Sequence, residues 1–167
     1  NAAEMCAATC NVSREDQDIF SYNSHLKAGN AIKEGYFKPG ILPINVEEVY
    51  LDAKGKKQKR NFIIDTDEGV RADTSPEGLA KLKPAFAMGG TVTAGNSSQT
   101  SDGAAFVIVM SEKMVNELGL KPIARLVNCA SAGVSPRLMG IGPVEAIPKA
   151  LKQAGMTIND IDLIELN

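Results

Sequence analysis

The apolar run from Ala104 to Met110 constrains the fold more than any other part of this sequence. Every residue in the run is hydrophobic, with no polar residue in between. A strand with one solvated face alternates apolar and polar residues, whereas a strand covered on both faces reads as a continuous apolar run. The run therefore predicts a strand in the middle of a sheet that is buried on both faces.

The sequence after this run predicts a strand–helix–strand unit. Ile123 to Ala130 has the character of a strand, Pro143 to Ala154 that of a helix closed by Gly155, and Ile161 to Leu166 that of a final strand. Two strands joined through a helix pair in parallel, with a right-handed crossover. This order of elements places the chain in the α/β class.

Two helices are predicted before residue 40. Asn1 to Cys10 is alanine-rich and reads as a helix. Ser13-Arg14-Glu15-Asp16 resembles a capping box in which Asp replaces Glu or Gln. The second helix begins there and is expected to stop at Gly35.

Two shorter helices are predicted further along the chain. Ser75 is the expected cap of a helix that has Pro76 at its first position and ends near Pro84. The other runs from Lys113 to Leu118 and is closed by Gly119.

Two strand-like stretches, Ile41 to Leu51 and Asn61 to Asp65, flank a turn-rich basic stretch that begins at Asp52. This pattern indicates a hairpin or a longer excursion. The basic run that reaches Arg60 is most simply a solvated loop, and a phosphate contact is the alternative.

Composition narrows the classes of function. The chain has 167 residues, is 44% hydrophobic and carries a net charge of -2, so it is long enough to bury a core and has no charge excess that points to nucleic acid or an anionic membrane. No apolar run approaches the roughly 18 residues that a membrane helix needs. The N-terminal stretch has no basic flank and no long apolar block, so it is not read as a signal peptide.

The three cysteines, Cys6, Cys10 and Cys129, are too few and too odd in number for a disulfide framework. A reducing compartment is the better expectation. A cytoplasmic location is expected, with an organelle not excluded in a eukaryote. Cys6 and Cys10 share a helix face, but a zinc site needs two more ligands, and no metal site is expected.

The segment from Gly89 to Ala105 is rich in Gly, Ser and Thr. It lacks the Gly-Lys-Ser/Thr of a phosphate-binding P-loop, and its glycines do not match the dinucleotide fingerprint. Its small side chains and open backbone suit close approach by an extended ligand that carries amides. A tight turn that feeds the buried strand is the competing interpretation.

The same segment, GGTVTAGNSSQTSDGAA, is similar to a hallmark segment of the thiolases. Several other stretches resemble thiolase motifs in the same order along the chain. They are SREDQD at residues 13–18, DTDEGVR at 65–71, LAKLKPAF at 79–86, MGIGP at 139–143 and DLIELN at 162–167. The resemblance covers nearly the whole chain and is weakest over residues 41–61.

The resemblance implies a thiolase-like fold and an acyl-transfer reaction. Residues 1–88 would form the loop domain that covers CoA, residues 89–120 the end of the N-terminal core half, and residues 121–167 the start of the C-terminal core half. In this family a cysteine attacks a 3-ketoacyl-CoA, acetyl-CoA leaves, and a second CoA takes the acyl group from the enzyme. The family's nucleophilic Cys would precede this chain, and its Gly-His-Pro histidine and second Cys would follow it.

The residues that remain are implied to handle CoA. Arg71 matches an arginine near the CoA adenine and phosphates, with a surface ion pair as the alternative. Ser98 matches a serine that hydrogen-bonds the pantetheine arm, with a simple turn hydroxyl as the alternative. The pantetheine channel would be lined by Leu82, Phe86, Ala94 and Gly95, and the acyl pocket bordered by Met139, with core packing as the alternative for Leu82, Phe86 and Met139.

Asn167 matches the asparagine that holds a water for an oxyanion hole, and it is the single catalytic candidate. Cys129 is expected in the core, and His25 on a solvated helix face, so no Cys–His pair is expected. Gly78 departs from relatives that carry serine there, which puts a polar contact with the nucleotide in doubt at this position.

These features favour an internal segment of a degradative 3-ketoacyl-CoA thiolase that is inactive by itself. A segment of a biosynthetic acetoacetyl-CoA thiolase, a non-catalytic acyl-CoA-binding module and an inert truncation are the alternatives. The resemblance implies CoA as a substrate, no permanently bound cofactor, no nucleic-acid or membrane partner, and a homodimer or homotetramer for the complete protein.

Overall fold

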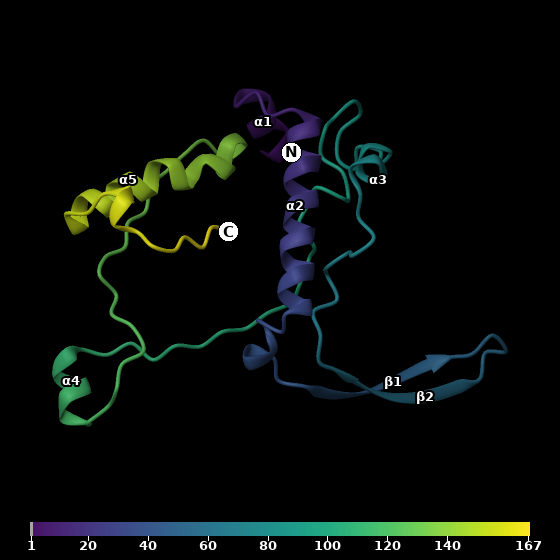
Figure 1. The fold of residues 1–167 in the computed structure, drawn as a ribbon, viewed down its shortest axis with the longest axis horizontal. Helices are drawn as coiled ribbons and strands as arrows, with labels where there is room; N and C mark the ends of the chain where they lie inside the picture. Colours follow the sequence, from purple (N-terminus) through teal and green to yellow (C-terminus); the bar gives the residue numbers. More distant parts are fainter. Residues whose placement is uncertain (1) are drawn as a thin grey trace. The chain divides into compact units, whose positions relative to one another are not determined.

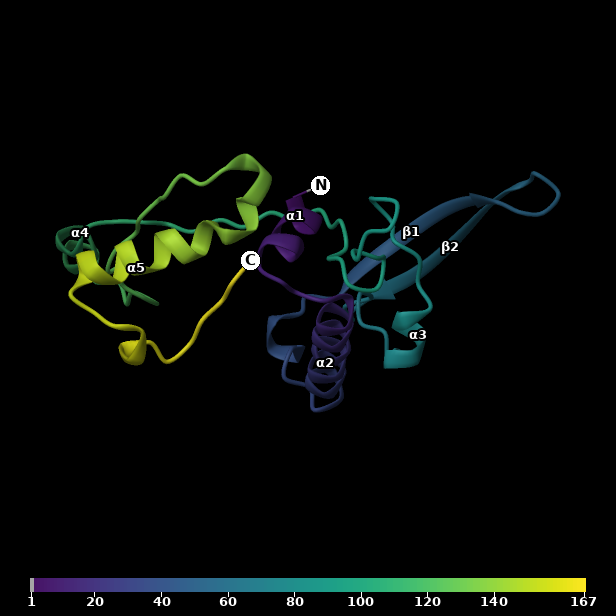
Figure 2. The same ribbon diagram turned by 90° about the horizontal axis from the view of Figure 1, so that it is seen from above.

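The computed structural model describes residues 2–167 and divides into two compact units. The hairpin unit comprises Arg14–Ala85 and Val92–Gln99. The C-terminal unit comprises residues 2–13, Phe86–Thr91 and Thr100–Asn167. The ribbon is drawn from two directions in Figures 1 and 2.

The hairpin unit is built on the long helix α2, Arg14–Lys33. The short 3-10 helix η1, Lys38–Gly40, follows it. Strands β1, Ile44–Leu51, and β2, Lys57–Ile64, then form an antiparallel ribbon (Figure 1). Helix α3, Pro76–Ala80, packs against α2 and is capped by Ser75, whose Oγ accepts a hydrogen bond from the Gly78 N–H. The cap and first-position proline predicted for α3 are therefore confirmed, although the helix ends before Pro84.

Glycines end three helices as the sequence predicts. After α2, Gly35 takes a φ of 76° and donates its N–H to Ile32 O, while the Tyr36 N–H bonds to Ala31 O. This pair of bonds is the Schellman arrangement, which satisfies carbonyls at a helix end and favours glycine. The same arrangement recurs at Gly119 and Gly155, both of which have positive φ.

The basic run that reaches Arg60 is a loop only as far as Lys56, because β2 begins at Lys57, so the loop interpretation is wrong for residues 57–60. Opposite charges across the ribbon stabilise the strand pairing. Lys59 Nζ lies 2.8 Å from Glu47 Oε1, and Arg60 Nε lies 2.5 Å from Glu48 Oε2. Lys59 and Arg60, at the end of the run, thus pair with the two glutamates of β1.

The C-terminal unit contains α1 (Ala2–Thr9), α4 (Glu112–Glu117), the 3-10 helices η2 (Pro136–Ile141) and η3 (Ile158–Asp160), and α5 (Gly142–Ala154). Helices α1 and α5 both contact η2. The helices predicted over residues 1–10, 113–118 and 143–154 are confirmed, with small shifts at their ends.

The strands predicted over 104–110, 123–130 and 161–166 do not form in residues 2–167, whose single sheet pairs β1 with β2. Phe106 and Val107, which are neighbours in the predicted central strand, are 96% and 85% exposed, so neither side chain is covered. A strand needs a neighbour to satisfy its backbone groups. The segment over residues 123–130 instead contacts α5, where Asn128 Nδ2 donates to Ala150 O.

The core is small and lies in the hairpin unit. Among residues 2–167 the buried side chains are Leu79, Val92, Asp18 and Thr93. The expectation of a sizeable apolar core is therefore wrong for this structure, because its most apolar runs have no partner sheet within it. Cys129, which was expected in the core, is exposed for the same reason.

Candidate functional site

A pocket of about 920 Å³ opens in the hairpin unit. This volume lies within the range of about 300–1,000 Å³ that is common for small-molecule sites. Four segments line it: one face of α2, the stretch from Asp67 to Ser75, the α3 region, and the loop from Ala94 to Gln99. Segments far apart in the sequence thus converge on one cavity.

Helix α2 contributes one side of the pocket through side chains at helical spacing. Phe20 and Ser21 lie one turn before Ser24 and His25, and Ala28 follows one turn later. Residues three and four apart share a helix face. Phe20 is 78% exposed, which leaves an aromatic surface at the pocket.

The loop from Thr93 to Ser98 is held by its own hydrogen bonds. The Thr93 N–H donates to Asn96 Oδ1 at 2.7 Å, and the Gly95 N–H donates to Thr93 Oγ1 at 3.2 Å. Ser97 Oγ donates to Thr93 O at 2.6 Å. Thr93 is fully buried, so the loop turns around its side chain and presents Ser98 to the pocket.

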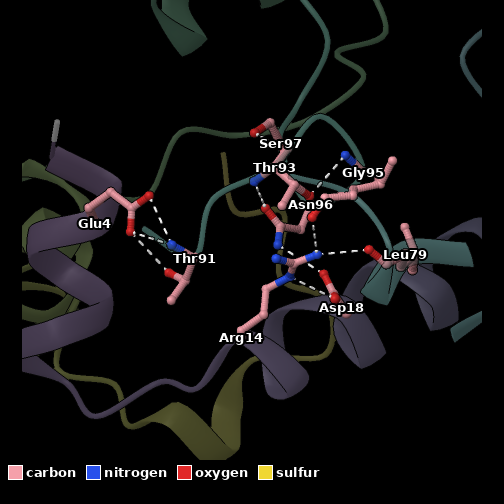
Figure 3. Close-up of polar contacts among 10 residues, drawn as sticks. Glu4, Arg14, Asp18, Leu79, Thr91, Thr93, Gly95, Asn96 and Ser97 are labelled. Carbon is pink, nitrogen blue, oxygen red and sulfur yellow. Dashed lines mark hydrogen bonds and ion pairs between the residues drawn. The ribbon is translucent and has the colours of Figure 1, made fainter. Parts of the chain in front are cut away.

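A charged network lies beneath this loop (Figure 3). Arg14 Nε lies 2.8 Å from Asp18 Oδ2, and Asn96 Nδ2 donates to Asp18 Oδ1 at 3.0 Å. Arg14 Nη2 donates to the carbonyls of Leu79 and Leu82 at 2.8 and 3.0 Å. The side chain of Asp18 is only 8% exposed, so its charge is compensated by these donors rather than by water.

Gly95 is the point at which the loop meets the α3 region. A Cβ at this position would lie 2.5 Å from Leu79 Cδ2 and 2.5 Å from Leu82 Cδ1. No side chain fits that space without a shift of one wall. Glycine is therefore favoured here by close approach of the two leucine side chains, not by an unusual φ.

The stretch before α3 is held to α2 through His25. The Arg71 N–H donates to His25 Nδ1 at 3.1 Å, and the Gly69 N–H donates to Asp67 Oδ1 at 3.0 Å. The Arg71 guanidinium makes no ion pair within residues 2–167, so its charge is available to a ligand.

The structure brings most of the sequence candidates together. The pocket is lined by Arg71, Leu82, Ala94, Gly95 and Ser98. Phe86, Met139 and Asn167 belong to the C-terminal unit and are not among the lining residues. Phe86 and Met139 are 61% and 67% exposed, so the expected alternative of core packing does not hold for either of them here.

Sequence reasoning missed His25, Asn96 and the pair Arg14–Asp18. His25 is half-buried and bonded, where a solvated surface position was expected. Its spacing of four residues from Ser21 was the available signal. Arg14 and Asp18 are also four apart, a spacing that pairs opposite charges on a helix.

Two exposed carboxyls outside the pocket have a lowered pKa. For Asp52 the pKa falls mainly because Gln58 donates to the carboxylate, with further bonds from the Lys56 and Lys54 N–H groups. For Asp160 the pKa falls because the Thr157 N–H and hydroxyl donate to it. Both carboxylates close local turns, which gives them a structural role.

The part of the chain that the structure describes holds no cluster of three or more His, Cys, Asp or Glu side chains placed to bind a metal ion. None of the helices in residues 2–167 has the length and apolar character to cross a membrane. The pocket instead offers small hydroxyls, apolar walls, the Arg71 guanidinium and the carboxyls of Asp67 and Asp73. This arrangement can hold an elongated, amide-bearing ligand with an anionic end.

Comparison with known proteins gives one family throughout. The family model for the thiolase N-terminal domain matches residues 1–113, and that for the thiolase C-terminal domain matches residues 120–167. A 3-ketoacyl-CoA thiolase of Bacillus subtilis is 49% identical over all of this chain, and an acetyl-CoA acetyltransferase of Syntrophomonas wolfei is 51% identical over 93% of it.

The chain spans 43% and 37% of the lengths of these two relatives. The crystal structure of the Bacillus anthracis acetyl-CoA acetyltransferase superposes with a TM-score of 0.83, at 41% identity, over 97% of this chain and 39% of that one. The predicted α/β class and thiolase-like fold are thereby confirmed. The chain belongs to the thiolase family.

Proposed function

We propose that this chain is an internal part of a longer thiolase that cleaves 3-ketoacyl-CoA with CoA, and that it supplies one wall of the CoA site. One observation carries the proposal. Residues assigned to CoA from the sequence resemblance, among them Arg71, Leu82 and Ser98, line a single pocket of the hairpin unit. The folding of the chain brings these positions together from separate segments.

The chemistry of the pocket suits the parts of CoA. The pantetheine arm is extended and carries two amides between short apolar stretches, which the Ser98 hydroxyl and the walls of Leu82 and Ala94 match. The adenine and phosphates need a planar cation. Arg71 supplies a guanidinium that stacks on rings and binds phosphate oxygens in pairs.

The reaction transfers an acyl group twice. A cysteine thiolate attacks the keto carbon, the C2–C3 bond breaks, and the acetyl-CoA carbanion equivalent takes up a proton. The thiol of a second CoA then attacks the acyl-enzyme, and the cysteine leaves as thiolate. In this proposal the nucleophile and the base come from other parts of the protein, as the resemblance implies, and His25 of this chain accepts from the Arg71 N–H.

The remaining assignments stay predictions within this proposal. They are the oxyanion-hole role of Asn167, the ligand contacts of Phe86 and Met139, and the division at residues 88 and 120. CoA acts as a substrate, with no permanently bound cofactor, in a homodimer or homotetramer. A reducing, cytoplasmic location stays an expectation that rests on the odd and sparse cysteine count.

The degradative branch is preferred over the biosynthetic one because residues 96–102 and 142–148 resemble it more closely. The test is thiolysis by the full-length protein on 3-ketoacyl-CoA substrates of increasing chain length. We expect loss of the 3-keto thioester absorbance when CoA is added to substrates longer than acetoacetyl-CoA. Activity confined to acetoacetyl-CoA would favour the biosynthetic branch. Thiolysis by the 167-residue chain alone would contradict the proposal that the nucleophile and the base lie outside it.

A further inference from the structure

The Arg14–Asp18–Asn96 network lies behind the pocket, and its first two members do not line it. Asp18 connects two walls of the pocket, the α3 region and the loop from Ala94 to Gln99. One carboxylate oxygen accepts from Arg14, which holds the Leu79 and Leu82 carbonyls of the α3 region. The other accepts from Asn96, which fixes the turn of the loop.

We propose that Arg14 and Asp18 are positioning residues that set the spacing between these two walls, and so the fit of the ligand. The inference rests on the proposed function, because the ligand named is the pantetheine arm of CoA. It gives a role to Arg14 and Asp18, which lie in the motif at residues 13–18 but have no role from the resemblance and do not line the pocket.

The spacing is tight where the network acts. At Gly95 the loop lies so close to Leu79 and Leu82 that a Cβ would meet both at 2.5 Å. The network bonds to the backbone of Leu79 and Leu82 and to the side chain of the residue after Gly95. A small displacement of Asp18 would therefore move both the α3 region and the loop beside Gly95, where the two walls lie closest together.

The hydrogen-bond directions define a sharp test. Asp18 accepts twice, while Asn96 donates to Asp18 with its amide nitrogen and accepts from the Thr93 N–H with its oxygen. Asp18→Asn replaces one acceptor by a donor, so one bond must be lost whichever way the amide turns. Asn96→Asp sets two carboxylates against each other.

Exchanging the two side chains restores the hydrogen bonds of residue 18 to Arg14 and to residue 96, and that of residue 96 to the Thr93 N–H, while the negative charge moves from position 18 to position 96. In the double variant Asp18→Asn/Asn96→Asp, the new amide oxygen accepts from Arg14 and the new amide nitrogen donates to the new carboxylate. The other oxygen of that carboxylate accepts from the Thr93 N–H. Glu47→Gln is the matched control, because it removes a carboxylate that pairs with Lys59 in the hairpin, away from the pocket.

The experiment measures CoA binding by calorimetry and CoA KM and kcat for the full-length protein and these variants. We expect each single variant to weaken CoA binding about tenfold, the scale of one hydrogen bond to a charged group. The KM for CoA rises and kcat per folded molecule is kept. The double variant returns to within about twofold of wild type, and Glu47→Gln is unchanged.

Single variants that melt earlier yet bind CoA as wild type does would overturn the proposal, since the network would then be merely structural. A double variant no better than the worse single variant would overturn it too, even if that single variant fails to fold.

If wild-type protein does not bind CoA, the proposed function fails by itself. The rate of amide hydrogen exchange over residues 93–98 then tests the positioning role. A faster rate in the single variants that returns to the wild-type rate in the double variant supports the role, and equal rates in all variants refute it.

Discussion

The hairpin unit and the C-terminal unit differ in what holds them together. In the hairpin unit, buried Asp18 and Thr93 are hydrogen-bonded by groups of α2 and of the loop from Thr93 to Ser98, and Leu79 and Val92 are buried as well. In the C-terminal unit, the apolar segments at 104–110, 123–130 and 161–166 are largely exposed and unpaired within residues 2–167. The more hydrophobic unit is thus the less buried one.

This difference shows that hydrophobic content does not by itself give a core. An apolar strand is stabilised only when a neighbour pairs its backbone and a second layer covers its faces. The hairpin unit needs neither for its pocket, because helix, turn and side-chain bonds come from within residues 14–99. The pocket accordingly lies in the unit whose polar groups are hydrogen-bonded from within the unit.

Matched leucine truncations in the 167-residue chain test this contrast most strongly. Leu79 is 5% exposed and Leu163 is 87% exposed. Leu79→Ala is expected to lower the free energy of unfolding by about 2–3 kcal/mol, because it opens a cavity, and Leu163→Ala by less than about 0.5 kcal/mol. Urea unfolding measures the free energy of unfolding of both variants. Equal losses in the two variants would contradict the difference in burial between the two units.

Gly95→Ala is expected to have a smaller effect on stability and a clear one on the pocket. The added methyl forces Leu79 or Leu82 to move, at a cost of about 1–2 kcal/mol. Gly40→Ala is the control, because a Cβ there has no neighbour within 4 Å. Thermal unfolding gives the melting temperatures of the two variants. Equal melting temperatures would argue against a tight contact of Gly95 with Leu79 and Leu82.

The smallest expected effect is the acid response of the hairpin turn. The pKa of Asp52 is lowered on folding by the Gln58 bond and then by the two N–H bonds, so the carboxylate stabilises the turn above its unfolded pKa, near 3.8. That contribution is lost as the pH falls through the lower, folded pKa. The Lys54 and Lys56 amide shifts should move together in an acid titration by NMR. Asp52→Ala should abolish this transition, and its persistence would assign the transition to another group.

Local signals predicted much of the fold. Gly35, Gly119 and Gly155 ended helices as expected, and Ser75 capped α3, since these depend on a few neighbouring residues. Strand pairing could not be predicted in the same way. The run from Ala104 to Met110 shows what a strand needs but not whether its neighbours are present.

The residues of the candidate site also divide into those found from local motifs and those joined only by folding. Arg71 and Ser98 were found through motif resemblance, and the structure places both at the pocket. Asp18 was hidden because its partners, Arg14 and Asn96, are 4 and 78 residues away, and only folding joins them. A buried charge read from sequence looks like any other helix-surface carboxylate.

The most direct test of the account is CoA titration of the full-length protein carrying Arg71→Ala or Arg60→Ala. Arg71 is unpaired within the described residues and lines the pocket, whereas Arg60 pairs with Glu48 on the hairpin. Arg71→Ala is expected to weaken CoA binding about tenfold and to leave pantetheine binding unchanged, because pantetheine lacks the nucleotide. Arg60→Ala should leave both affinities unchanged. Unchanged CoA affinity in Arg71→Ala, or a loss confined to Arg60→Ala, would contradict the placement of the CoA site in this pocket.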